Sequence, residues 1–189
     1  MVVSNICSDF WMGGRKAELR EFYDQTADFY ERRYREIQLW KYELARRYLL
    51  PCERLLEVGC GTGLYLRELQ RLAGLVVGVD FSEGMLRKAR GLLVLADAEH
   101  LPFRDGVFDQ VLSITALQNF PEPLRALAEM NRVLRSGGRL VLSSLKKKHP
   151  LPVLVEMVGR SGFGALEVLD PPECEDAFVV ATKSDGSTL

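Results

Sequence analysis

The sequence predicts an α/β fold in which helices cover a mostly parallel β-sheet. After residue 51, short aliphatic runs alternate with polar stretches of helical character. These runs are continuously apolar, which is typical of strands covered on both faces of a parallel sheet. Residues 1–50 lack such runs and instead predict a helical cover, so residues 51–189 would form the core of the fold.

The composition fits a single domain over residues 1–189. The chain has 47% hydrophobic residues, 27% charged residues and a net charge of -1, which argues against disorder and repetitive fibrous structure. A near-neutral charge gives no general attraction to nucleic acid. No apolar run approaches the roughly 18 residues that span a bilayer, and the N-terminus does not resemble a signal peptide. We therefore expect a cytoplasmic protein without a membrane partner.

The first predicted element is helical and covers residues 16–49. This region is rich in charge, lacks glycine and proline, and carries aromatic and aliphatic residues at helical spacing. It predicts one long helix or two consecutive helices, and Pro51 ends the region.

Seven strands and four further helices are predicted after this region. The strands are residues 54–58, 75–79, 92–96, 108–114, 139–144, 164–169 and 177–183. The helices are residues 63–72, 82–90, 123–134 and 151–161. A short turn at residues 170–172 separates the last two strands, so they should form an antiparallel hairpin that reverses one C-terminal strand.

The strongest signal is a glycine-rich turn between the first predicted strand and the helix after it. Residues 57–63 read Glu-Val-Gly-Cys-Gly-Thr-Gly. Glycines at alternate positions allow a tight turn and close approach of the backbone to a ligand, although a plain strand-to-helix turn is the alternative. A dinucleotide fingerprint would need a third glycine at Leu64 or Leu66. The pattern therefore favours a nucleotide-like cofactor of another kind.

Asp80 ends the second predicted strand, about 20 residues beyond the glycines. A carboxylate there can accept hydrogen bonds from both hydroxyls of a ribose. The alternative is that Asp80 only begins a turn or caps a helix, but Ser82 already fits the capping role.

The glycine motif resembles the first motif of the class I S-adenosylmethionine-dependent methyltransferases. Further similar motifs follow in order: Leu-Ala-Asp-Ala-Glu-His-Leu-Pro-Phe at 95–103, Asp-Gly-Val-Phe-Asp-Gln-Val at 105–111, and Leu-Arg-Ser-Gly-Gly-Arg-Leu at 134–140, where Ser136 replaces the usual proline. The resemblance covers residues 54–144 closely. It implies a Rossmann-like, doubly wound sheet of seven strands with an antiparallel C-terminal strand.

The resemblance also implies the cofactor, S-adenosylmethionine, and the residues that hold it. These residues are Glu57, Gly59, Cys60, Gly61, Gly63, Asp80, Phe81, Asp97 and Ala98. Among them, Asp97 would accept from the adenine amino group and the Ala98 backbone would meet the ring edge. Tyr23 and Tyr30 lie in a helical segment similar to one that closes the site in many relatives, although both also fit the aromatic core stripe of an amphipathic helix.

Gln118 and Asn119 follow the fourth predicted strand and would face the methyl acceptor. No histidine stands there, so a histidine general base is not supported. The implied reaction is methyl transfer to an RNA, protein or small-molecule acceptor by a monomer or homodimer, with a small activator subunit as a candidate partner. A non-catalytic methyltransferase-like protein and a nicotinamide-dependent oxidoreductase are the alternatives. The four cysteines, Cys7, Cys52, Cys60 and Cys174, are widely spaced, and no metal site is expected.

Overall fold

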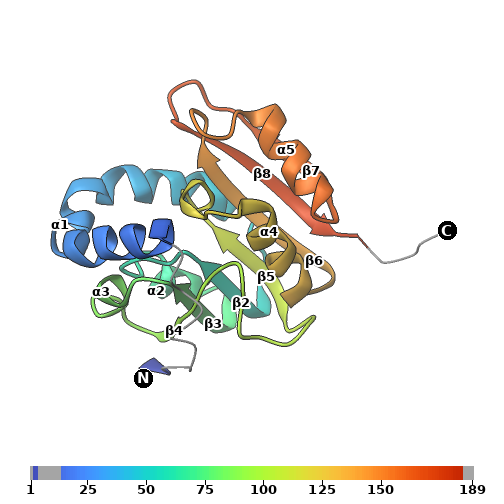
Figure 1. Ribbon diagram of the computed structural model, residues 1–189. Coiled ribbons are helices and arrows are strands. Elements are labelled where there is room, and N and C mark those ends of the chain that lie inside the picture. Colours follow the sequence, from blue (N-terminus) through green and yellow to red (C-terminus); the bar gives the residue numbers. More distant parts are fainter. Residues whose placement is uncertain (1, 4–13, 185–189) are drawn as a thin grey trace.

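The computed structural model describes residues 2–3 and 14–184 and contains an eight-stranded sheet with the order β1-β4-β3-β2-β5-β6-β8-β7 (Figure 1). The strands are β1 (Val2–Val3), β2 (Cys52–Val58), β3 (Ala73–Asp80), β4 (Leu92–Leu95), β5 (Phe108–Ser113), β6 (Leu134–Leu145), β7 (Phe163–Leu169) and β8 (Asp176–Lys183). The helices are α1 (Gly14–Ala45), α2 (Leu66–Leu69), α3 (Glu83–Leu86), α4 (Pro123–Val133) and α5 (Leu151–Arg160), with short 3-10 helices η1 (Arg46–Tyr48) and η2 (Leu117–Asn119).

The sheet confirms the predicted architecture. All pairs are parallel except those of β8, which runs antiparallel to both β6 and β7. All seven predicted strands are present, and the last two form the expected hairpin. The two residues of β1 add an eighth strand beside β4. A two-residue strand carries no periodic pattern, so the sequence did not predict it.

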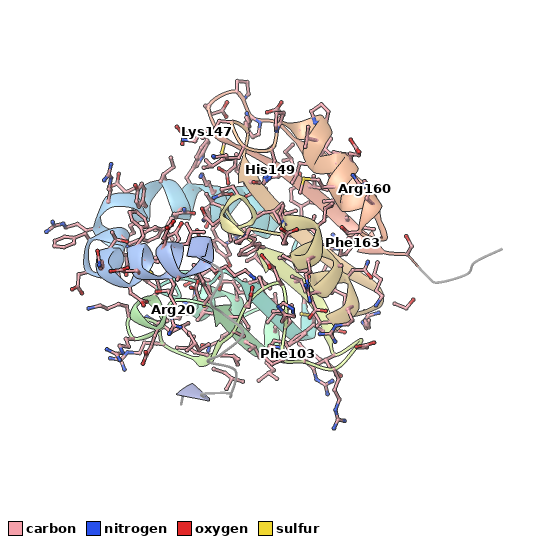
Figure 2. The ribbon with its side chains drawn as sticks, viewed as in Figure 1. Arg20, Phe103, Lys147, His149, Arg160 and Phe163 are labelled. Carbon is pink, nitrogen blue, oxygen red and sulfur yellow. The ribbon has the colours of Figure 1, made fainter. Side chains whose placement is uncertain are left out.

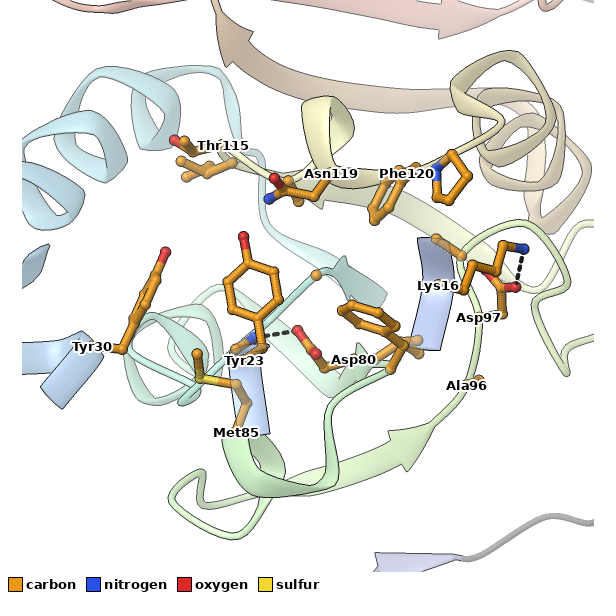
Figure 3. A pocket seen from close by; sticks show the side chains of 18 residues that line it. Lys16, Tyr23, Tyr30, Asp80, Met85, Ala96, Asp97, Thr115, Asn119 and Phe120 are labelled. Atoms are coloured by element: carbon orange, nitrogen blue, oxygen red, sulfur yellow. Dashed lines mark hydrogen bonds and ion pairs between the residues drawn. The ribbon is translucent and has the colours of Figure 1, made fainter. Parts of the chain in front are cut away.

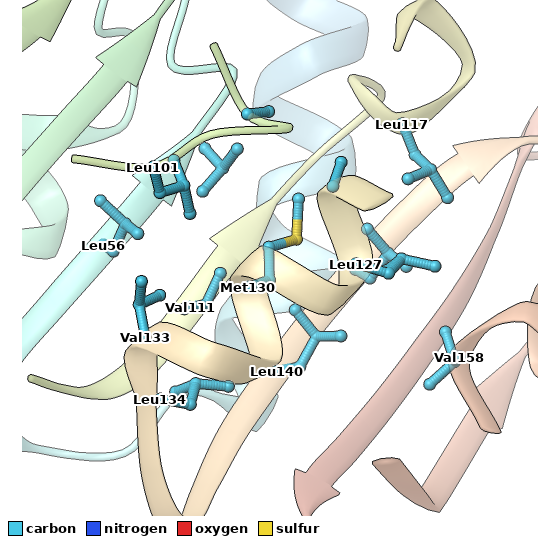
Figure 4. Close-up of a cluster of buried hydrophobic side chains, with 14 of the residues drawn as sticks. Leu56, Leu101, Val111, Leu117, Leu127, Met130, Val133, Leu134, Leu140 and Val158 are labelled. Atoms are coloured by element: carbon cyan, nitrogen blue, oxygen red, sulfur yellow. The ribbon is translucent and has the colours of Figure 1, made fainter. Parts of the chain in front are cut away.

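Helices cover both faces of the sheet, which is why the carboxyl-terminal halves of its central strands β2 and β3 are buried on both sides. On one face, Met130 of α4 and Val158 of α5 are fully buried in a cluster with Leu56 of β2 and Leu140 of β6 (Figure 4). On the other face, the end of α1 packs with α2, α3 and Leu55 of β2. Because neighbouring residues of a strand point to opposite faces, β2 contributes to both clusters.

The helices that follow β2 and β3 are shorter than predicted. Residues 63–72 contain only the single turn α2, because Gly63 has a left-handed backbone with a φ of +74° and belongs to the preceding turn. Residues 82–90 contain only α3, since the chain turns back before β4 begins at Leu92. The predicted cap of α3 is confirmed: the Ser82 hydroxyl accepts a hydrogen bond from the Met85 backbone N–H at 3.1 Å.

The first region is one continuous helix of 32 residues, α1, rather than two. No helix within residues 14–184 is long and apolar enough to cross a membrane. Cys52, Cys60 and Cys174 are free thiols, whereas Cys7 lies outside the described residues.

Candidate functional site

A cavity lies at the carboxyl ends of β2, β3, β4 and β5, with α1 over it (Figure 3). The strand order changes direction between β2 and β5, which is where open α/β sheets bind ligands. The lining includes Lys16, Tyr23 and Tyr30 from α1, Gly59 and Gly61 after β2, Asp80 and Phe81 at the end of β3, Asp97 and Ala98 after β4, and Thr115 and Asn119 after β5. Eight of the eleven predicted cofactor residues therefore meet at one cavity.

The glycine loop after β2 needs glycine for two different reasons. Gly59 and Gly61 both have left-handed backbones, with φ values of +75° and +53°. A Cβ added to Gly59 would lie 2.5 Å from the Cβ of Ala116, so this glycine lets β2 and the loop after β5 approach each other. A Cβ added to Gly61 would meet no atom within 4 Å. Gly61 therefore exposes its backbone to the cavity.

Asp80 joins the end of β3 to this loop. Its Oδ2 accepts a hydrogen bond from the Gly61 backbone N–H at 2.8 Å, and its Oδ1 accepts from the Ser82 N–H at 2.9 Å. Burial raises the pKa of Asp80 to about 6, although these backbone hydrogen bonds oppose the shift. The side chain is thus an ionised acceptor at neutral pH, and each oxygen retains a lone pair for a ligand.

Three predicted cofactor residues, Glu57, Cys60 and Gly63, do not line this cavity. Glu57 follows Leu55 on the sheet face covered by α1, because side chains alternate along β2. Its carboxyl is buried, its Oε2 has no hydrogen-bond partner among the described residues, and burial raises its pKa well above the usual range. Cys60 is buried in the core on the same face of the sheet. Direct contact of these three with a cofactor stays a prediction.

Lys16, near the start of α1, is a lining residue that the sequence did not suggest. Its Nζ donates a hydrogen bond to Asp97 Oδ2 at 2.7 Å and also contacts Glu99. Farther along α1, Asp24 Oδ1 accepts from the Ser82 hydroxyl at 2.6 Å. These contacts hold α1 against the cavity, whose volume is about 70 Å³. This volume is smaller than the roughly 300 to 1,000 Å³ that ligand sites commonly enclose, and α1 packs directly against it.

Tyr23 and Tyr30 are half-buried, and their positions are compatible with both predicted roles. They extend from α1 into the cavity, and they also belong to an aromatic stripe in which their ring centroids are 6.2 Å apart (Figure 3). The Tyr23 ring packs edge-on against Phe81, with centroids 6.0 Å apart. Burial raises the pKa of both hydroxyls. At neutral pH they are therefore hydrogen-bond donors and not bases.

The two predicted acceptor-facing residues are placed differently. Asn119 lines this cavity, whereas Gln118 lines only a neighbouring cavity under the middle of α1. The Gln118 side-chain amide donates to the Thr115 carbonyl and accepts from the Ser144 hydroxyl at 3.1 Å, which shapes the turn after β5. Thr115 has a φ of +54°, the one left-handed backbone outside glycine among the described residues. Such strain is typical of functional sites.

Comparison with known proteins agrees with this arrangement. Residues 56–142 match a domain family described as a methyltransferase domain. The chain is 38% identical over 126 residues to a demethylmenaquinone methyltransferase of Clavibacter sepedonicus, covering 62% of this chain and 51% of that protein. The chain spans about half the length of the first curated relatives that it matches.

Solved structures show the same fold. A methyltransferase from Thermotoga maritima, described as dependent on S-adenosylmethionine, superposes with a TM-score of 0.71 at 25% identity, covering 88% of this chain and all of that one. A methyltransferase-like protein of Haloferax volcanii, solved with the Trm112 methyltransferase activator, has a TM-score of 0.71 at 20% identity and covers 86% of this chain and 98% of that one. Together with the motif order and the cavity, these matches show that residues 56–142 form a methyltransferase domain with the fold of the class I S-adenosylmethionine-dependent methyltransferases.

Proposed function

We propose that this protein transfers the methyl group of S-adenosylmethionine to an acceptor and releases S-adenosylhomocysteine. The observation that carries the proposal is the pairing of Asp80 with the Gly61 backbone at the floor of the cavity. An ionised carboxylate beside an open glycine backbone suits a ribose at a site with no pyrophosphate to bind. The cofactor supplies an electrophilic methyl group, which an acceptor lone pair attacks as the carbon–sulfur bond breaks.

Different residues of the cavity would bind different parts of the cofactor. Asp80 would accept from the ribose hydroxyls, and Asp97 would accept from the adenine amino group once Lys16 releases it. Tyr23 and Tyr30 would cover the cofactor and exclude water. Orientation of the acceptor supplies much of the rate, because the methyl donor is already reactive.

The relatives also suggest which acceptor and which partner to test. The name of the Clavibacter relative supports a small-molecule acceptor over RNA or protein. The Haloferax protein, which has the same fold, was solved with a methyltransferase activator, so a small activator subunit is the partner to test for this chain. Affinity purification of the native protein followed by mass spectrometry tests the partner, and recovery of the chain alone as a monomer or homodimer would reject it.

Calorimetry with S-adenosylhomocysteine and with NADH tests the cofactor directly. We expect binding of S-adenosylhomocysteine and no measurable binding of NADH. Labelled-methyl transfer into metabolite, RNA and protein fractions then tests catalysis. Cofactor binding without transfer would favour the non-catalytic alternative, and binding of NADH alone would favour the oxidoreductase.

The affinity for S-adenosylhomocysteine should fall as the pH is lowered through about 6. The pKa of Asp80 is about 6, and only its ionised form accepts from both ribose hydroxyls. Below that pH the affinity should drop by about tenfold per unit, while above about pH 7 it should be constant. Calorimetry between about pH 5 and 7.5 measures this. Asp80→Asn should flatten the profile, and a flat profile in the unmodified protein would contradict the assignment.

Lys16→Ala should strengthen binding of S-adenosylhomocysteine by about two- to fivefold and speed its association. The Lys16 ammonium occupies the Asp97 oxygen that adenine would use, and breaking that partly exposed pair costs about 0.5–1 kcal/mol. Stopped-flow fluorescence measures the rate. Lys88→Ala is the matched control, because Lys88 also pairs with α1, through Asp28, but does not line the cavity. Equal effects of both substitutions would show that Lys16 does not restrict the site.

A further inference from the structure

A second cavity lies beside the first, under the middle of α1. Its volume is about 410 Å³, which is within the range of small-molecule sites. Four residues line both cavities: Tyr23, Tyr30, Thr115 and Asn119. A molecule bound in the second cavity would therefore lie directly against the cofactor cavity.

The outer wall of this second cavity is aromatic. Phe22, Phe29 and Tyr34 line it, and they are 57%, 60% and 37% exposed. Large apolar side chains gathered at an exposed site mark a binding surface. Flat rings pack best against another planar, apolar group. The wall thus favours a planar aromatic molecule.

The inner end of the cavity holds a buried ion pair between α1 and β8. Lys41 Nζ donates to Asp176 Oδ1 at 2.7 Å, and the two side chains are only 3% and 0% exposed. Lys41 also donates to the Thr115 hydroxyl at 3.1 Å. A buried ion pair is commonly no more stabilising than apolar residues of the same volume. Stability alone therefore does not explain why charges are placed here.

The hydrogen bonds around Asp176 fix the position of the Lys41 ammonium. Asp176 Oδ2 accepts from the hydroxyls of Thr115 at 2.6 Å and Ser143 at 2.7 Å. Lys41 has three N–H donors, and its bonds to Asp176 and Thr115 use two of them. Lys41 lines the second cavity, so its remaining donor is the one that would serve a ligand there. The bond to Thr115 places this charge at the boundary between the cavities.

The charges of the lining favour an anion. Arg33, Lys41 and Lys147 line the second cavity together with one carboxylate, Glu175, while Asp176 balances Lys41 from below the lining. Lys147 follows β6 at the edge of the cavity and is exposed (Figure 2). A ligand with a negative oxygen near Lys41 would gain a charge-assisted hydrogen bond in a site shielded from water.

We propose that the second cavity is the acceptor site and takes a small planar aromatic molecule whose hydroxyl reacts as its oxyanion, held by Lys41. This inference rests on the proposed methyl transfer. The oxyanion lone pair forms the bond to the methyl carbon, the carbon–sulfur bond breaks, and its electron pair stays on sulfur. The hydroxyl releases its proton to solvent on binding, favoured by the Lys41 ammonium, so the reacting oxyanion has no proton left to lose. The step therefore needs no general base, which fits the protonated hydroxyls of Tyr23 and Tyr30.

A coloured phenol tests the proposal on the full chain saturated with S-adenosylhomocysteine. The probe is 4-nitro-1-naphthol, whose oxyanion absorbs visible light, and its methyl ether is the neutral control. We expect the protein to bind the oxyanion at least about tenfold more tightly than the ether and to promote ionisation of the bound probe. Lys41→Met should abolish both effects while S-adenosylhomocysteine still binds.

A second variant is needed as a control for misfolding, because Lys41→Met leaves Asp176 buried without its ion partner. The double variant Lys41→Met with Asp176→Asn removes both charges and should show the same loss. Lys147→Met, at an exposed position, should weaken the oxyanion by only about two- to threefold.

Separate outcomes distinguish this inference from the proposed function. If S-adenosylhomocysteine binds but the oxyanion is not preferred, or if the preference survives in both Lys41 variants, the acceptor assignment is overturned. A short RNA oligomer that binds at least about tenfold more tightly than the probe would also overturn it. If S-adenosylhomocysteine itself does not bind, the proposed function fails.

Discussion

Asp80→Ala is expected to weaken the binding of S-adenosylhomocysteine by at least about 100-fold, since hydrogen bonds to a carboxylate contribute about 1.5–3 kcal/mol each. The substitution removes the acceptor for the ribose hydroxyls. It also removes the carboxylate that fixes the Gly61 and Ser82 backbone N–H groups at 2.8 and 2.9 Å. Calorimetry measures the affinity, and thermal unfolding shows whether the fold is retained.

Asp109→Ala is the matched control for this prediction. Asp109 also accepts two backbone hydrogen bonds, from Glu53 at 3.1 Å and Arg54 at 2.8 Å, but it lies at the opposite end of the central strands. Its loss should lower the stability and leave the affinity unchanged. If Asp80→Ala binds S-adenosylhomocysteine as well as the unmodified protein does, the cofactor does not occupy this cavity in the proposed way.

Substitution of Gly59 by alanine should mainly lower the stability of the fold, whereas substitution of Gly61 by alanine should mainly lower the affinity for the cofactor. At Gly59 the new Cβ would lie 2.5 Å from the Ala116 Cβ on a left-handed backbone, so the free energy of unfolding should fall by about 2–4 kcal/mol. At Gly61 the new Cβ meets no protein atom, so only the backbone strain of about 1–2 kcal/mol is expected. That methyl group would, however, stand where the cofactor must approach, and the affinity should fall by at least about tenfold.

Urea unfolding and calorimetry separate these two effects. Gly159→Ala serves as a control, because a Cβ there also meets nothing within 4 Å and Gly159 lies inside α5 without a left-handed backbone. It should leave the affinity unchanged and slightly increase the stability. An unchanged affinity in Gly61→Ala would show that the Gly61 backbone does not contact the cofactor.

Much of the fold was predictable because its signals are local. The continuous aliphatic runs predicted seven of the eight strands, and the short turn before β8 predicted the reversed strand. The lengths of α2 and α3 were predicted less well. The predicted helix began at Gly63, but this residue is held in a left-handed turn, where a Cβ would lie 2.8 Å from the Cβ of Ala89. That neighbour comes from another part of the chain.

Some residues of the candidate site were predictable from local sequence, and others were not. The sequence by itself determined the glycine turn and Asp80, because a strand end followed by glycine or carboxylate is a local pattern with a local physical meaning. The aspartate after β4 was implied by the resemblance of its motif. Only the tertiary structure brought Lys16 to Asp97 across 81 residues and Lys41 to Asp176 across 135. It also turned Gln118 toward Ser144 beside the second cavity and left Asn119 where the two cavities meet. The physical reason is that these contacts depend on how the strands are ordered in the sheet and on where α1 lies over them, and no periodicity or steric preference of neighbouring residues encodes either arrangement.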